Sequence, residues 1–184
     1  MSIVLVGSTS GSITLQEPAV AGTTVLNLPA VSGTLVTTGS PQSGSVLQVV
    51  NSTTSTQVSN ATNTYVDTGL TATITPKFAT SKILVLVSQN GVQKNSANAN
   101  NMVDIIIARN GTGILPANMA GTLAETGTTL QNSVTASCSY LDSPATISAT
   151  TYKTQFASRN NTASVFVQWA NVSTSFITLL EIAA

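Results

Sequence analysis

Two strand-length segments dominated by consecutive Ile, Leu and Val side chains constrain the fold of this chain most strongly. They are Lys82–Val87, which contains Ile83-Leu84-Val85-Leu86-Val87, and Val103–Ala108, which contains Ile105-Ile106-Ile107. Successive side chains of a strand point to opposite faces, so both segments are apolar on both faces. An Asn-Gly pair, which is typical of a tight turn, follows each segment at Asn90–Gly91 and Asn110–Gly111. The pattern predicts two strands, each covered by a core on one side and by something else on the other.

Further short segments rich in β-branched residues recur along the chain and are separated by polar turns. This spacing indicates an all-β, antiparallel sandwich of the jelly-roll type with about eight strands. The last segment is apolar on both faces, which predicts a central strand or a strand at a subunit interface. Ile114–Gly127 has a weak strand signal and is expected to form a long loop or a single helical turn. The other expected strands are Val46–Val50, Tyr65–Thr68, Ala72–Thr75, Val134–Asp142, Thr151–Ser158, Ser164–Trp169 and Ser175–Ile182.

Residues 1–40 differ from the rest of the chain. Their apolar runs are only a few residues long and are interrupted by Pro18, Gly22 and Pro29. Strands this short cannot bury a core alone, but they can if three chains wrap around one another or lie on a partner surface. We therefore predict a fibrous or anchoring arm over 1–40 and a jelly-roll domain over 41–184; the alternative is a set of edge strands of the main domain. The arm is expected to anchor through Ile13, Leu15, Leu26 and Leu28.

Charged residues are scarce in this sequence, with six basic and six acidic side chains and a net charge of zero among 184 residues. Nucleic-acid binding is not expected, because it needs clustered Lys and Arg. Little charge repulsion keeps copies apart, which favours self-association. Histidine is absent and Cys138 is the single cysteine, so Ser-His-Asp sites, Cys-His sites and ordinary zinc sites are excluded.

The acidic residues do not predict a catalytic pair. Asp104 is expected to be an ion-pair partner of Arg109 or Lys82, and Glu181 a partner of a basic residue or a neighbouring subunit. A glycosidase would need two carboxyl groups about 5–10 Å apart. We predict no enzymatic activity and no cofactor, and the sequence leaves open a Ca²⁺ ion among loop oxygens. The other acids expected in turns or at strand ends are Asp67 and Asp142.

Neither a secretion signal nor an apolar run of the roughly 20 residues needed to span a bilayer is present, so no membrane insertion is expected. Synthesis and assembly are expected in a cytoplasm.

Aromatic side chains are few, and a sugar-binding platform would need one of them exposed. Trp169, near a predicted strand end, is expected in the core or at an interface.

Several strings in this chain resemble one family of proteins. Gly11–Thr38 resembles the short fibre-like segment in structural proteins of marine tailed phages, cyanophages especially. Tyr65–Gly91, Tyr140–Thr154 and Ser175–Ala183 resemble the β-rich head domain that follows that segment in the same proteins. The resemblance implies a virion component that forms a homotrimer, with a jelly-roll knob similar to the C1q/TNF type. It supplies no catalytic residues.

One small module directly after the arm favours a capsid decoration protein, of the cement or head-fibre kind, on the capsid surface of a virion. The arm would then bind the major capsid protein. The alternative is a tail fibre or tail-tip subunit that binds a tail protein and recognises host surface glycans in a lectin-like manner. In either case the trimer is expected to form through the two-sided apolar strands. The residues expected at the trimer interface are Ile83, Val85, Ile106, Phe176 and Leu180.

Overall fold

The structure is a computed structural model, and it describes residues 3–16, 19–20, 22–23, 25, 30, 32, 36–94, 102–115, 133–159 and 163–184. The chain divides into two compact units, Met1–Leu35 and Val36–Ala184. The sequence placed the boundary after residue 40, inside a turn-rich segment. Each unit is described by itself.

The smaller unit contains an antiparallel hairpin of two strands, β1 (Ile3–Val6) and β2 (Ser12–Leu15). Its five-residue loop is closed by a hydrogen bond of 2.9 Å from the backbone N–H of Gly7 to the carbonyl oxygen of Gly11. Two of the predicted anchoring residues lie on β2: Ile13, which is exposed, is opposite Leu5, and Leu15 is opposite Ile3. The other two, Leu26 and Leu28, lie outside the described residues.

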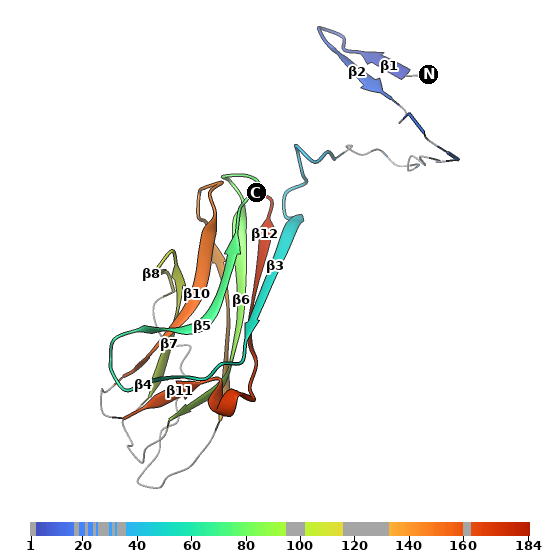
Figure 1. Cartoon of the computed structure of the whole chain (residues 1–184). Coiled ribbons are helices and arrows are strands. Elements are labelled where there is room, and N and C mark those ends of the chain that lie inside the picture. The colour runs from blue at the N-terminus through green and yellow to red at the C-terminus, as the bar shows by residue number, and fades with distance from the viewer. Residues whose placement is uncertain are drawn as a thin grey trace. The chain divides into compact units, whose positions relative to one another are not determined.

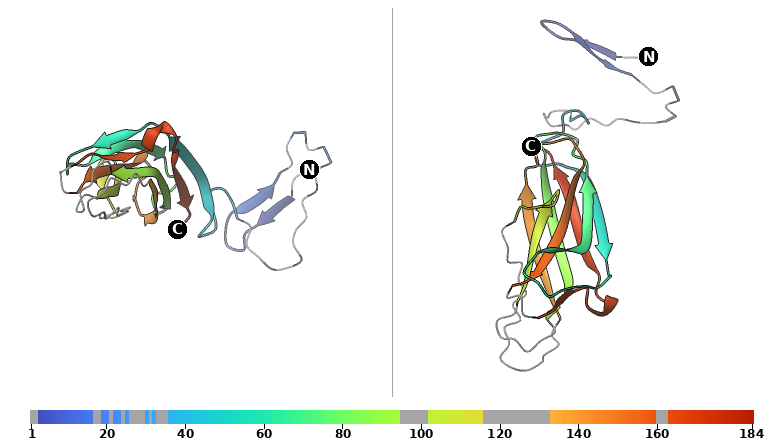
Figure 2. Two further views of the ribbon diagram at one scale, coloured as in Figure 1. Left: turned by 90° about the horizontal axis from the view of Figure 1, so that it is seen from below. Right: turned by 60° about the vertical axis from the view of Figure 1, so that its left-hand side comes forward.

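The larger unit is a sandwich of two antiparallel sheets (Figure 1, Figure 2). The large sheet has the strand order β3 (Val46–Thr54), β12 (Ser175–Ile182), β6 (Lys82–Lys94) and β9 (Val134–Asp142). The small sheet has the order β5 (Val66–Ile74), β10 (Thr150–Ser158), β7 (Val103–Arg109) and β8 (Thr112–Gly113). The second half of β6 also pairs with β11 (Val165–Val167), which pairs with β4 (Val58–Asn60). A single 3₁₀ turn, η1 (Trp169–Asn171), follows β11.

The strands pair as nested antiparallel partners. β3 pairs with β12, β5 with β10, β6 with β9, and β7 with β8, so early strands lie beside late ones in both sheets. This is the arrangement of a long antiparallel ribbon wrapped into a jelly roll. The all-β, antiparallel prediction is confirmed. β12 lies between β3 and β6, which confirms the prediction of a central position for the last strand.

The core lies between the two sheets and is built from the inward side chains of their central strands. Alternate residues of β5, β6, β9 and β12 are buried, as expected for strands with one face on a core. The apolar side chains of these sheets that are almost completely enclosed include Leu70, Ile74, Ile83, Val85, Ile105, Ile107, Tyr152, Phe156, Ile177 and Leu179.

The two Asn-Gly pairs have different structures. Asn110–Gly111 forms the predicted turn between β7 and β8, with positive φ at both residues, as a two-residue hairpin of type I′ requires. The turn predicted at Asn90–Gly91 is wrong, because these residues form a bulge inside β6. The pairing with β9 shifts between Gln89 and Val92, and Gly91 has φ +61°.

Other segment boundaries differ from the sequence predictions. Tyr65–Thr68 and Ala72–Thr75 belong almost entirely to one strand, β5, because Gly69 with φ +83° makes a bulge rather than a break. The strand predicted over Ser164–Trp169 ends at Val167, because Gln168 adopts a left-handed conformation and leads into η1. The loop predicted at Ile114–Gly127 lies almost wholly outside the described residues.

Candidate assembly surface

The outer face of the large sheet carries a continuous row of aliphatic side chains. Val49 on β3 is opposite Leu180 on β12, Leu180 is opposite Leu84 on β6, and Leu84 is opposite Leu141 on β9. Directly opposite residues share a face of the sheet, and their Cβ atoms lie about 5 Å apart. We call these four residues the aliphatic row; it crosses the whole sheet.

Two further rows lie on the same face. In the next row Leu86 lies between Thr178 and Ser139, and in the third row Phe176 is opposite Ser88. Several of these apolar side chains remain open to solvent: the exposed fraction is 58% for Val49, 49% for Leu141, 44% for Phe176 and 38% for Leu86. Large apolar side chains gathered on one face are typical of an interaction surface.

A shallow hollow of about 590 Å³ lies between these rows. Serine side chains border it on β6 and β9, and the ring of Phe176 borders it on β12. The thiol of Cys138, which is opposite Val87 and packs against the core on the other side of the sheet, is half-buried, and burial raises its pKa. The face therefore presents both partly exposed apolar side chains and a shallow recess.

The outer face of the small sheet is different, because it carries charges. Lys153 on β10 forms an ion pair of 2.7 Å with Asp67 on β5, and Gln155 donates a hydrogen bond of 2.8 Å to the same carboxylate. Chiefly the hydrogen bond from Lys153 lowers the pKa of Asp67. On the outer face of the large sheet, the charged residue that the described strands contribute is Lys82, at the first position of β6.

The residues predicted for the trimer interface are not on one surface. Phe176 and Leu180 lie on the outer face of the large sheet. Ile83 and Val85 are on the opposite side of β6 and are completely buried in the core of their own chain. A contact between copies at β6 would therefore use their outward neighbours. Ile106 is half-buried on the small sheet, opposite Gln155.

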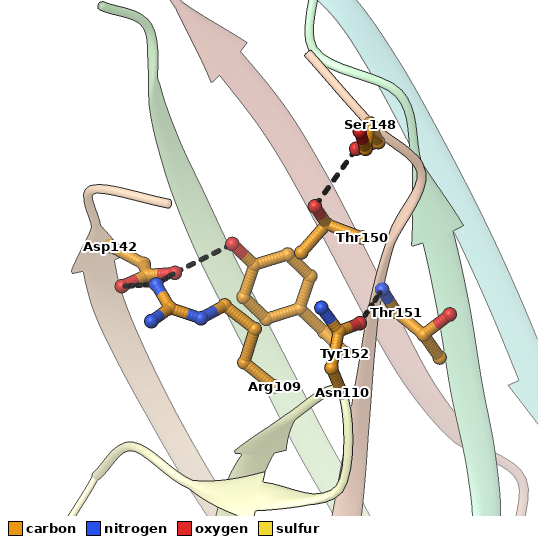
Figure 3. A network of polar contacts seen from close by, with 7 residues as sticks. All are labelled: Arg109, Asn110, Asp142, Ser148, Thr150, Thr151 and Tyr152. Carbon is orange, nitrogen blue, oxygen red and sulfur yellow. Dashed lines mark hydrogen bonds and ion pairs between the residues drawn. The ribbon is translucent and has the colours of Figure 1, made fainter. Parts of the chain in front are cut away.

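An ion pair joins the two sheets at one end of the core (Figure 3). Arg109 at the end of β7 donates hydrogen bonds of 2.9 and 2.8 Å from Nη1 to the two carboxylate oxygens of Asp142 at the end of β9. The hydroxyl of Tyr152, on β10, donates a third hydrogen bond of 2.7 Å to Asp142. Burial and then this acceptor raise the pKa of Tyr152, and the hydrogen bond to Asp142 raises the pKa of Arg109.

The partners predicted for two other acids are wrong. Asp104 pairs with Arg159 at 2.6 Å rather than with Arg109 or Lys82, because Arg159 follows β10 directly and Asp104 lies near the start of the adjacent β7. Glu181 is buried in β12 and accepts its hydrogen bonds from neutral groups: the Gln48 amide at 2.6 Å and the backbone N–H of Lys77 at 2.7 Å. The backbone amide of Lys77, in a loop, and the side-chain amide of Gln48, on the neighbouring β3, occupy the place of the expected cation.

The aromatic residue singled out in the sequence lies at the end of the sandwich where β4, β11 and η1 meet (Figure 1). Trp169 is half-buried and packs edge-to-face on Phe166, with ring centroids 4.9 Å apart.

In the part of the chain that the structure describes, no group of three potential metal-ligating side chains is present. The same residues include no helix long and apolar enough to cross a membrane.

No protein-family model matches this sequence. No curated protein sequence is similar to it either. Among solved structures, the chain is similar to T=1 particles derived from infectious bursal virus, with 13% sequence identity and a TM-score of 0.37 over 98% of this chain and 44% of that one. It is also similar to a mutant VP2 protein of infectious bursal disease virus in derived T=1 particles, with 12% identity and a TM-score of 0.37 over 94% and 46% of the two chains. The chain spans less than half the length of each.

Proposed function

We propose that this chain is a structural subunit of a bacteriophage virion: a homotrimeric capsid decoration protein, anchored by its N-terminal arm and without catalytic activity. One observation carries the proposal: the domain leaves on one sheet face a row of partly exposed aliphatic side chains, flanked by Ser, Thr and Asn and almost free of charge. A protein that acts alone in solution rarely keeps such a face open. The scarcity of charge in the whole sequence and its resemblance to phage virion proteins agree with this role.

The arm has the chemistry of an anchor. Its hairpin exposes Val4, Leu5, Val6 and Ile13, and a two-stranded hairpin with exposed aliphatic side chains is marginal in water by itself. Such a hairpin gains stability when another surface covers it. Glu17 is the single charged residue of the first 40, so the attachment would rest on apolar contacts and backbone hydrogen bonds.

The test is the location of this protein in intact virions. Antibody labelling or a three-dimensional reconstruction should find it in a dense, regular array on the capsid. Removing residues 1–40 should leave the number of subunits in the oligomer unchanged and abolish binding to virions that lack the protein. Attachment should also change little between low and high salt, because it involves few ion pairs. Absence from virions, or a truncated protein that still binds them, would contradict the proposal.

A tail-fibre or tail-tip subunit with lectin-like receptor binding is the second candidate. The partly exposed Phe166–Trp169 pair at one end of the sandwich favours it, because sugars stack on exposed aromatic rings. This candidate predicts labelling at the tail and binding to host surface glycans. That binding should be lost in Trp169→Ala and retained in Val172→Ala, a control at an exposed residue beside the same turn.

A further inference from the structure

We infer that the outer face of the large sheet is the surface through which copies of this chain pack against one another, with the aliphatic row and Phe176 at the centre of the contact. This inference rests on the proposed self-assembling role and identifies the partner of the exposed face as a second copy of the chain. Three features of the face support that partner over another protein.

The first feature is regularity. Between Phe176 and Glu181 on β12 the pairing with β3 and β6 has no register shift; the bulges lie at the end of β12 and, on β6, after Gln89. A regular, unbulged sheet face presents its side chains in even rows, as the inner faces of stacked sheets do. The outer face therefore resembles an inner face that has no opposing layer within its own chain.

The second feature is the absence of charge, which matters most for identical partners. In a trimer whose copies turn the same face toward the threefold axis, a charged group near the centre of the contact approaches its own kind, and like charges repel. Here the charged residue of the face is Lys82, at the rim of the described strands. The amide of Asn51 already donates to Thr178 Oγ1 at 2.8 Å and to the carbonyl of Ile177 at 3.3 Å, so covering it does not leave its donor unpaired.

The third feature is shape and size. The aliphatic row stands beside the serine-bordered hollow on one face, so a raised part of one copy can enter the recess of the next. Four strands about 4.8 Å apart and about eight residues long cover roughly 500 Å². Three such faces turned toward one threefold axis would bury about 1,500 Å² in total, shared among the three contacts between copies. The charged face of the small sheet would remain in water.

The experiment compares full-length variants by sedimentation at micromolar concentration. Leu86 lies at the centre of the face with its side chain directed away from the core, so Leu86→Glu should give a folded monomer. Phe176→Ser removes apolar surface without adding charge and should raise the subunit dissociation constant at least about tenfold. Thr73→Glu is the matched control, because Thr73 is an outward strand residue of the small sheet; it should keep the wild-type mass.

Each outcome is decisive. Wild-type mass in Leu86→Glu, or loss of the oligomer in Thr73→Glu but not in Leu86→Glu, would overturn the inference. A cooperative urea transition for each variant shows that it is folded, which separates loss of assembly from loss of folding. If Leu86→Glu does not fold, the dissociation constant of Phe176→Ser tests the inference instead. Virion labelling reports separately on the proposed function: a protein present on capsids whose face variants keep the oligomer would refute this interface and leave the virion role in place.

Discussion

The carboxylate of Asp142, on the large sheet, is held by two hydrogen bonds from Arg109, on the small sheet. Asp142 is almost fully enclosed, whereas about a third of the Arg109 side chain is open to solvent. The carboxylate also accepts the Tyr152 hydroxyl, so its oxygens are satisfied without water (Figure 3). One residue at the end of β9 thus connects both layers of the sandwich.

Replacing Asp142 should destabilise the domain strongly. Asp142→Ala would leave the Arg109 guanidinium and the Tyr152 hydroxyl without their acceptor in a mostly buried place. We expect a loss of about 2–4 kcal/mol, toward the lower part of the range for buried pairs because Arg109 is partly exposed. Asp67→Ala, at the exposed pair with Lys153, should cost less than about 1 kcal/mol. Urea unfolding of both variants tests this; equal losses would contradict it.

Protonation of Glu181 should lower the free energy of unfolding of the domain at acid pH. Burial acts to raise its pKa, but hydrogen bonds from Gln48 and from the backbone N–H groups of Lys77 and Phe78 help lower it below the ordinary 4.5. The unfolded chain therefore binds a proton at a higher pH than the folded chain does. The contribution of Glu181 is fully present above its ordinary pKa and is lost as the pH falls through the folded value.

The measurement is the urea midpoint of wild type and Glu181→Gln between pH 7 and pH 3. The wild type should lose stability progressively below about pH 5, and the variant should be less stable at pH 7 with a shallower decline. Asp67 also has a lowered pKa and contributes to the wild-type decline, so Asp67→Asn serves as the comparison. A variant whose decline is as steep as that of wild type would show that Glu181 is not responsible.

Gly91 should not tolerate a side chain. It has φ +61°, and a Cβ atom there would lie 2.5 Å from the backbone nitrogen of Trp169 and 2.8 Å from Ser173 Cβ. Gly91→Ala should therefore cost more than the roughly 1–3 kcal/mol of left-handed strain alone. Gly111 also has positive φ but faces open space, so Gly111→Ala should cost only about 1 kcal/mol. Thermal unfolding of both variants tests this: the excess loss of stability in Gly91→Ala over Gly111→Ala reports the steric clash, because both variants share the left-handed backbone strain.

Substitution of Ser175 should destabilise the domain, although its side chain is small. Its Oγ accepts hydrogen bonds from Gln89 and Gln168, both at 3.0 Å, and from the backbone N–H of Asn90 at 2.8 Å. Ser175→Ala leaves these buried donors unpaired and should cost about 2–3 kcal/mol. Ser139→Ala, on the outer face of β9, should change the free energy of unfolding by less than about 0.5 kcal/mol. Similar losses in the two variants would exclude a special role for the Ser175 hydroxyl.

The sequence predicts strands best where one pattern fills a whole segment. Val134–Asp142 and Ser175–Ile182 were predicted with the bounds that the structure has, because their residues alternate or are apolar throughout and polar residues flank them. Asn90–Gly91 was misread because Asn-Gly suits a turn and a bulge equally. The choice depends on η1, whose backbone approaches Gly91 from a distant part of the chain.

The candidate surface could be predicted only in part. Local sequence shows that β6 and β12 are apolar on both faces, but it cannot tell which face meets the core of the same chain. Ile83 and Val85 were therefore placed at an interface, whereas Leu84 and Leu86 are the outward residues. Ion pairs were missed for a related reason: Arg109 and Asp142 lie at the ends of strands in different sheets, β7 and β9, and meet only when the two sheets pack together.

The central position of β12 has a consequence for synthesis on the ribosome. Val50 on β3 pairs with Leu179 on β12, so β3 cannot form this pairing until β12 has been translated, more than a hundred residues later. Until β12 emerges, β3 and β6 have no strand between them, and the gap exposes backbone groups that another unfinished chain could bind. A chain stalled before Ser175 would keep that gap open, so the large sheet, and with it the aliphatic row, exists only in copies that have been translated through their last strand.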